Sequence, residues 1–163
     1  MNPFEILGLS PELVKAVNEL GYETPTPIQE ATIPAILNSN NDLIALAQTG
    51  TGKTAAFGLP IQERLDILSS DIQALILSPT RELCIQIHRD LETYSKFLPE
   101  LKQTAIYGGS DVPKQIKALK GKPQIVVGTP GRVLDLIGRK VLKVEKIKWL
   151  VLDEADEMLN MGF

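Results

Sequence analysis

Residues 47–54 read Ala-Gln-Thr-Gly-Thr-Gly-Lys-Thr, and this stretch decides the fold. It follows the apolar run 43–46, which has the length of a buried strand, and it precedes a helical stretch. A glycine-rich loop in that context is typical of a Walker A loop, whose backbone N–H groups converge on phosphate oxygens. Ala47 stands where the general pattern has glycine. The alternative is a glycine-rich turn that only caps a helix.

The residue types in this loop predict that it binds a nucleoside triphosphate. Lys53 supplies positive charge for the outer phosphates, and the Thr54 hydroxyl suits a magnesium ion. The candidate cofactor-binding residues of the loop are Ala47, Gln48, Thr49, Gly50, Thr51, Gly52, Lys53 and Thr54.

Further apolar runs follow the loop and alternate with amphipathic stretches. Runs of strand length occupy 74–77, 125–127 and 149–152, with a weaker candidate at 103–107. Leu83, Ile87 and Leu91 recur at helical spacing, as do Val133 and Ile137. This alternation predicts an α/β fold, a mostly parallel sheet between layers of helices with its ligand site at the carboxyl ends of the strands.

An acidic cluster, Asp153-Glu154-Ala155-Asp156, directly follows the run 149–152. A carboxylate at the end of a buried strand beside a phosphate loop is suited to holding magnesium, largely through water. We therefore expect Asp153 to serve the metal and Glu154 to orient or deprotonate the attacking water. The alternative is an acidic first helical turn, favoured by the helix dipole.

The first residues of the chain predict helices rather than strands. Ser10-Pro11 and Thr26-Pro27 each combine a capping residue with a proline in the first helical turn. We expect residues 1–38 to form a helical segment packed on the core. Residues 39–163 would form the nucleotide-binding domain, both parts belonging to one structural unit.

Composition narrows the class of protein. The 163 residues carry a net charge of −3, which disfavours a small basic nucleic-acid module, so any polyanion must be held locally. One cysteine and one histidine exclude a disulfide framework and a zinc site built from Cys/His clusters. The longest apolar run is far shorter than a membrane span, and no signal peptide is evident. We expect a soluble cytoplasmic protein.

Six motifs occur in the order found in DEAD-box RNA helicases. The loop 47–54 and the acidic cluster read AQTGTGKT and DEAD, and residues 21–29 resemble the Q motif with Phe4 as its upstream aromatic. Pro79-Thr80-Arg81-Glu82-Leu83 resembles motif Ia, Gly108-Gly109 the glycine doublet, and Thr129-Pro130-Gly131-Arg132 motif Ib. The chain resembles the first of the two RecA-like ATPase domains of that family, from Phe4 to Phe163.

The resemblance implies that the nucleotide is ATP, that Mg²⁺ is its metal and that RNA is the partner. Phe4, Tyr22, Thr24 and Gln29 would contact the adenine side, and Lys53, Asp153 and Glu154 would take part in hydrolysis. RNA would be held through its sugar-phosphate backbone, with little sequence preference. The residues for RNA are Pro79, Thr80, Arg81, Gly108, Gly109, Thr129, Pro130, Gly131 and Arg132.

Several of these residues also have local structural explanations. Thr26 and Gln29 fit a capping box, which can coexist with the adenine role. Thr80 and Thr129 are expected to cap helices, and a capped helix start is also a phosphate site. Cys84 and His88 lie four apart but lack further metal ligands. The lysine-rich stretches 114–122 and 139–148 are interpreted as solvated faces rather than RNA contacts.

The sequence departs from the family pattern at its end. It stops just after the acidic cluster, whereas the family continues with a further strand and a second ATPase domain that supplies arginines. We expect the intact protein to be an ATP-dependent RNA helicase, which hydrolyses ATP. The fragment alone would lack turnover, and an uncovered sheet edge would invite self-association or lower its stability. A binding module without turnover and a P-loop motor acting on DNA are the alternatives.

Overall fold

The computed structural model describes residues 1–162. Within it the chain forms two compact units. The first unit holds residues 1–65 and 90–99, and the second holds residues 66–89 together with the described residues from Glu100 onward. None of the described helices is both long and apolar enough to cross a membrane.

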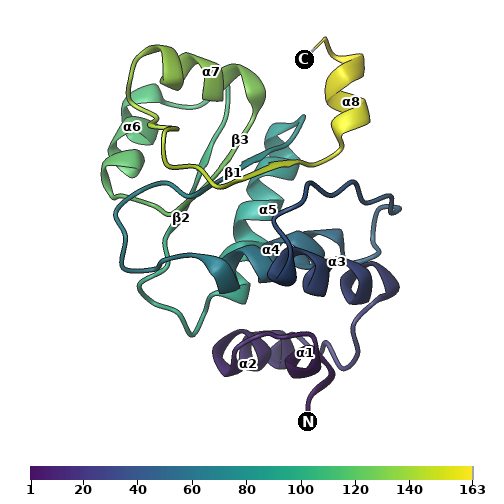
Figure 1. Cartoon of the computed structure of the whole chain (residues 1–163). Helices are drawn as coiled ribbons and strands as arrows, with labels where there is room; N and C mark the ends of the chain where they lie inside the picture. Colours follow the sequence, from purple (N-terminus) through teal and green to yellow (C-terminus); the bar gives the residue numbers. More distant parts are fainter. Residues whose placement is uncertain (163) are drawn as a thin grey trace. The chain divides into compact units, whose positions relative to one another are not determined.

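The first unit contains the four helices at the start of the chain (Figure 1). They are α1 (Pro3–Ile6), α2 (Pro11–Glu19), α3 (Pro27–Asn38) and α4 (Lys53–Arg64). The predicted starts at Pro11 and Pro27 are confirmed. The helical spacing of Leu13, Val14, Val17 and Leu20 predicts one apolar face; the first three are buried, whereas Leu20, after the end of α2, is 40% exposed. These residues form α2 because one face is apolar and proline is pre-organised for the first turn.

The strand predicted at residues 43–46 is wrong. These residues form no strand, and the side chains of Ile44 and Leu46 are 88% and 91% exposed. A short apolar run becomes a strand only when a neighbouring strand satisfies its backbone groups. Among the described residues, every strand of the sheet lies between Ala74 and Leu152, and none of them pairs with 43–46. The phosphate loop therefore follows an unpaired segment here.

The second unit is built on a sheet of four parallel strands. The strands are β1 (Ala74–Leu77), β2 (Gln103–Ile106), β3 (Ile125–Gly128) and β4 (Trp149–Leu152), in the order β2-β3-β1-β4 (Figure 1). The four corresponding apolar runs were all predicted as strands, and these predictions are confirmed. The parallel α/β class predicted from the sequence is confirmed with them.

Helices follow each strand of this unit. They are α5 (Arg81–Tyr94, within this unit as far as Arg89), α6 (Val112–Lys120), α7 (Pro130–Gly138) and α8 (Ala155–Asn160). Leu119 of α6 and Val133 of α7 pack with Leu75 and Val126 of the sheet in one buried cluster. The loop from the carboxyl end of each strand leads to the start of the next helix, so these loops share one edge of the sheet.

Candidate functional site

The loop 47–54 has the backbone geometry that its glycines suggest. Gly50 and Gly52 both have φ 82°, in the left-handed region where an L side chain is strained. Gly52 is the N-cap residue of α4, and Lys53 is the first residue of that helix. The Thr51 hydroxyl donates a hydrogen bond to the carbonyl oxygen of Gln48 at 2.6 Å, inside the loop. The loop therefore leads into a helix N-terminus, where an anion is stabilised.

Residues 21–29, which resemble the Q motif, are called the Q-like segment. Two of them hydrogen-bond this loop: Thr26, the N-cap residue of α3, and Gln29 in its first turn. The Thr26 hydroxyl donates to the carbonyl oxygen of Thr51 at 2.9 Å, and Gln29 Nε2 donates to that of Gly52 at 3.2 Å. The Thr26 N–H donates in turn to Gln29 Oε1 at 3.0 Å, which is the predicted return contact of the capping box. Gln29 is thus both a helix cap and a partner of the phosphate loop.

A pocket with a volume of about 420 Å³ lies beside the loop in the first unit. It brings together the sequence-predicted residues Tyr22, Thr24 and Gln29 with two glycines of the loop. Three lining residues, Gly21, Glu23 and Thr26, were not predicted as site residues, although all three lie inside the segment 21–29 that resembles the Q motif. The pocket is lined by Gly21, Tyr22, Glu23, Thr24, Thr26, Gln29, Gly50 and Gly52.

Phe4 lies elsewhere in this unit. Its ring belongs to α1 and has no exposed surface, so it offers no face to a ligand in this structure. Its N–H donates to Asn2 Oδ1 at 2.8 Å, which fixes the start of α1. The structure therefore places Phe4 in the core, as a lone aromatic in an apolar sequence is most often found. Its adenine role stays a prediction.

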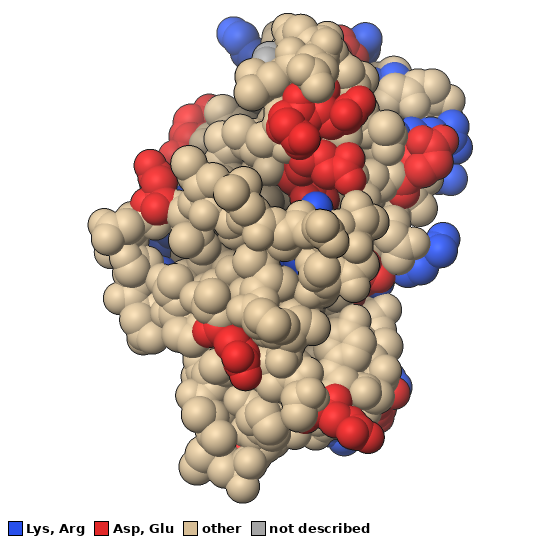
Figure 2. Space-filling view, turned by 90° about the vertical axis from the view of Figure 1, so that its right-hand side faces the viewer, with Lys and Arg blue, Asp and Glu red and all other residues tan. Residues whose placement is uncertain are grey.

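The acidic cluster lies in the second unit, where β4 ends. The Asp153 N–H donates to the carbonyl oxygen of Leu77 at 2.9 Å, which continues the pairing of β4 with β1. Glu154 follows with φ 52° and ψ 51°, a left-handed conformation that is uncommon outside glycine. Figure 2 shows acidic side chains gathered in the upper part of the viewed face, on the side where Figure 1 draws α8. The left-handed backbone of Glu154 is strained, and backbone strain of this kind concentrates at functional positions.

The residues expected to bind RNA follow β1, β2 and β3 at the carboxyl edge of the sheet. Thr80 caps α5, since its hydroxyl oxygen accepts the Leu83 N–H at 3.2 Å. Thr129 is the N-cap residue of α7, as expected, although its side chain makes no capping hydrogen bond. Its hydroxyl oxygen accepts instead from the Gly108 N–H at 3.4 Å. The reason is that the neighbouring strand brings the Gly108 N–H within reach of the side chain.

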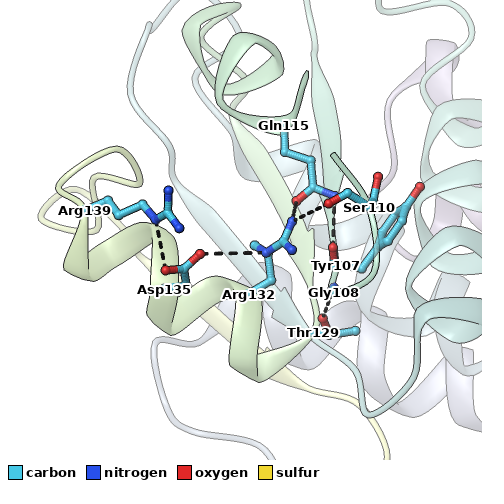
Figure 3. Close-up of polar contacts among 8 residues, drawn as sticks. All are labelled: Tyr107, Gly108, Ser110, Gln115, Thr129, Arg132, Asp135 and Arg139. Carbon is cyan, nitrogen blue, oxygen red and sulfur yellow. Dashed lines mark hydrogen bonds and ion pairs between the residues drawn. The ribbon is translucent and has the colours of Figure 1, made fainter. Parts of the chain in front are cut away.

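The glycine-doublet loop, residues 107–111, is held from several sides (Figure 3). Arg132 Nη1 donates to the carbonyl oxygen of Ser110 at 3.3 Å and to Gln115 Oε1 at 2.9 Å. Gln115 Nε2 donates to the carbonyl oxygen of Tyr107 at 3.0 Å. The Arg81 guanidinium lies 5.0 Å from the centre of the Tyr107 ring, within the range of a cation–π contact. Arg81 of the segment that resembles motif Ia and Arg132 of the segment that resembles motif Ib therefore both contact this loop.

This arrangement gives Arg132 a role that its sequence position does not reveal. The guanidinium hydrogen-bonds the loop 107–111 and Gln115, and the Arg132 side chain is only 12% exposed. Gln115 completes the contact and is 5% exposed, although nothing in its helical sequence context marks it as a site residue. Tyr107 carried a weak signal, as an aromatic residue directly before two glycines.

Cys84 and His88 each contact a backbone carbonyl oxygen in the second unit. The Cys84 side chain is fully buried, and its Sγ lies 3.4 Å from the carbonyl oxygen of Val127. Burial raises the pKa of the Cys84 thiol to about 12, so it is neutral and inert near neutral pH. His88 Nε2 lies 3.0 Å from the carbonyl oxygen of Gln103. In the described part of the chain, no three His, Cys, Asp or Glu residues cluster as metal ligands.

The fold and these sites define a class of protein. A parallel sheet with candidate residues at its carboxyl edge, together with a glycine loop that opens a helix, is the arrangement of nucleotide-dependent α/β domains. The comparison with protein families agrees with this class. The family described as DEAD/DEAH box helicase matches residues 26–163, and the chain belongs to this family.

Relatives and solved structures are similar over essentially the whole chain. The ATP-dependent RNA helicase CshA of Listeria monocytogenes is 56% identical over 163 residues, and that of Limosilactobacillus reuteri is 57% identical over 160. The chain covers 31% and 32% of these two proteins, about a third of their length.

Two solved structures have the same fold. The crystal structure of a DEAD box protein from the hyperthermophile Methanococcus jannaschii has a TM-score of 0.90 and 46% identity, covering 98% of this chain and 43% of that one. A variant of Saccharomyces cerevisiae Dbp5 bound to RNA and ADP BeF3 has a TM-score of 0.88 and 40% identity, covering 99% of this chain and 40% of that one. These domains are RecA-like, and the RecA-like fold predicted for this chain is confirmed.

Proposed function

We propose that this chain is the ATP-binding and RNA-contacting N-terminal domain of an ATP-dependent RNA helicase. Residues 39–163 would be the first RecA-like domain, with the helical segment 1–38 packed on it. The observation that carries the proposal is the glycine loop, which opens α4 beside a pocket lined by Tyr22, Thr24 and Gln29. The names of the CshA relatives support it. A cytoplasmic setting fits the single free thiol.

The donor set fits ATP with magnesium. Magnesium prefers oxygen ligands, and Thr54 and Asp153 are a hydroxyl and a carboxylate of the kind that hold it, largely through water. When bound, the ion neutralises charge on the phosphates. Lys53 would contact the outer phosphates, Gln29 would hydrogen-bond the adenine edge with its amide, and Glu154 would orient the attacking water.

RNA would lie along the carboxyl edge of the sheet in the second unit. The start of α5 after Thr80 and the start of α7 after Thr129 expose backbone N–H groups that favour phosphate. The exposed glycines Gly108 and Gly109 between them allow a close approach of the strand. Contacts to phosphate and sugar carry little sequence information, so the grip would be general. In the intact protein, hydrolysis would drive local duplex separation or remodelling of RNA–protein complexes.

The phosphate loop is tested by comparing ATP with adenosine. Lys53→Ala removes the cation proposed to meet the outer phosphates, so ATP affinity should fall about tenfold or more while adenosine affinity stays nearly unchanged. Isothermal titration calorimetry measures both ligands, and Lys114→Ala on the exposed face of α6 is the matched control. Equal ATP affinity of the wild type and the Lys53 variant would refute the assignment.

Turnover is expected to need more than the residues of this chain. Charge develops on the transferred phosphoryl group, and an arginine finger is worth on the order of a thousandfold in rate. The family places such arginines on a second domain. We expect the chain alone to show negligible RNA-stimulated ATP hydrolysis. A longer version that includes the second domain should recover it, and Glu154→Gln should abolish it there. Robust RNA-dependent hydrolysis by residues 1–163 would overturn this division of roles.

A further inference from the structure

The amino-terminal edge of the sheet in the second unit carries a pocket that the proposed function does not use. Its volume is about 500 Å³, and it is formed by segments that lead into three strands. Ile72 precedes β1, Leu119 lies near the end of α6 before β3, and Val141 lies in the stretch before β4. The candidate RNA residues follow the strands at the opposite edge. The pocket is therefore separate from the candidate site.

Lysines from two distant stretches surround this pocket. The stretches 114–122 and 139–148 are each interpretable from sequence as solvated faces. The structure brings them together on one pocket, and Figure 1 shows α6 and the segment leading into β4 on the same side of the sheet. Asp71 and Glu145 are the acidic residues of the lining, so its net charge is positive. The lining lysines are Lys120, Lys122, Lys143 and Lys146, all of them exposed.

Two lysines beside the pocket have a left-handed backbone conformation, in which glycine would be less strained. Lys122 (φ 58°) follows the end of α6, and Lys140 (φ 59°) follows the end of α7, next to the lining residue Val141. Glycine adopts this left-handed conformation with less strain than lysine does. The helix dipole favours a cation at both helix ends, but it does not account for Lys143 and Lys146, which lie in no helix. Other helices end with glycine at the same position, namely Gly8, Gly21 and Gly162.

The floor of the pocket is aliphatic. Ile72 and Leu119 belong to the buried cluster between the sheet, α6 and α7, and Val141 packs against it. Among the described residues that line the pocket none is aromatic, so it offers no ring on which a base could stack. Asp71 and Glu145 lower the positive charge of the lining toward any anionic ligand, so charge alone does not select between a nucleic acid and a peptide. The aliphatic floor can bury a peptide side chain but offers nothing to a phosphodiester backbone. The lining suits a peptide better than a nucleic acid.

We propose that this pocket is a docking site for a partner protein. The partner would insert an aliphatic side chain of an acidic segment onto Ile72, Leu119 and Val141, with its carboxylates facing the four lysines. Burial of the aliphatic side chain would supply affinity, and the lysines would steer and orient the segment. Because the pocket lies at the edge opposite the candidate RNA residues, a bound partner would leave that edge open.

The test is direct binding of a short fluorescent peptide of alternating leucine and glutamate to the purified chain, followed by anisotropy at low and moderate salt. The pair Lys143→Glu with Lys146→Glu should weaken binding about tenfold or more, because it reverses two charges that face the peptide. The pair Lys114→Glu with Lys117→Glu makes the same charge change on α6 outside the lining. This control should change affinity by less than about twofold, through screened long-range charge alone.

Further arms separate the aliphatic floor from bulk charge. A peptide with serine in place of leucine should bind at least about tenfold more weakly, because it has no side chain for the floor. If the charge-reversal pair lowers the thermal unfolding temperature, the neutral pair Lys143→Gln with Lys146→Gln replaces it. This neutral pair should also weaken peptide binding. Each of four outcomes overturns the proposal: no peptide binding, equal loss in the control pair, equal affinity of the serine peptide, or displacement of the peptide by single-stranded RNA.

Discussion

At the scale of single residues, Gly50 and Gly52 differ in what surrounds them despite the same φ of 82°. A Cβ at Gly50 would meet nothing within 4 Å, whereas a Cβ at Gly52 would lie 2.3 Å from Gln29 Nε2. Gly50 is thus required by backbone conformation alone. Gly52 is required by conformation and by the close approach of the Q-like segment. Substituting each glycine by alanine and comparing the two variants therefore isolates the effect of the Gln29 contact on stability.

The change Gly52→Ala should destabilise the chain more than Gly50→Ala. Both variants place alanine in the left-handed region, at a cost of about 1 kcal/mol. Gly52→Ala must also displace Gln29, which breaks its hydrogen bonds to Thr26 and Gly52 at about 1 kcal/mol each. The free energy of unfolding from urea titrations should be lower for Gly52→Ala than for Gly50→Ala. In a Gln29→Ala background, where the clash is absent, the difference between the two glycine variants should be smaller. Equal stability of the two single variants would contradict the prediction.

At the scale of elements, the carboxyl edge of the sheet depends on contacts between loops that follow different strands. Arg132 at the start of α7 reaches the loop after β2, and Gln115 of α6 completes the link. Arg132 Nε also lies 3.9 Å from Asp135 Oδ2, while Arg139 Nε pairs with Asp135 Oδ1 at 3.0 Å. Two arginines of one helix region thus share a carboxylate, but only Arg132 is seen to reach the loop.

The change Arg132→Ala should loosen residues 107–111. It removes two hydrogen bonds from a charged donor, each worth about 1.5–3 kcal/mol. We expect faster amide hydrogen exchange in that loop and weaker binding of single-stranded RNA. Arg139→Ala, which removes the other partner of Asp135, should leave both unchanged. Unaltered exchange in the Arg132 variant would show that the loop does not depend on this side chain.

At the scale of the whole molecule, the outer strand β4 pairs with β1 on one side. Leu150 and Leu152 of β4 are 59% and 50% exposed. An uncovered strand edge with exposed leucines is a template for pairing with another chain. The expected tendency to self-associate therefore has a specific location on the sheet.

Sedimentation velocity should show association that rises with protein concentration. Leu150→Lys with Leu152→Lys should keep the chain monomeric, because charged side chains on an outer strand oppose edge pairing. Leu134→Lys on α7 is the control, since Leu134 is 64% exposed but belongs to a helix and not to the outer strand. A monomeric wild type at high concentration, or equal association of all variants, would contradict the prediction.

Patterns within a few residues determined much of this protein from sequence alone. The runs 74–77, 103–107, 125–127 and 149–152 became the strands. The inner strands β1 and β3 are apolar because they are buried on both faces, whereas β2 and β4 are outer strands and partly exposed. Proline after a capping residue marked where α2 and α3 begin. The order of six motifs indicated the family to which the chain belongs.

Contacts between distant residues were decided only by the tertiary structure. The apolar run 43–46 looks like a strand, but pairing depends on a neighbour that no local pattern supplies. Thr129 bonds Gly108 instead of its own helix, and Arg132 bonds Ser110, because the sheet brings those loops together. The lysine-rich stretches met around one pocket for the same reason. Each depends on chain segments that come together only when the sheet forms, because the strand order β2-β3-β1-β4 follows from pairing between residues far apart in the sequence.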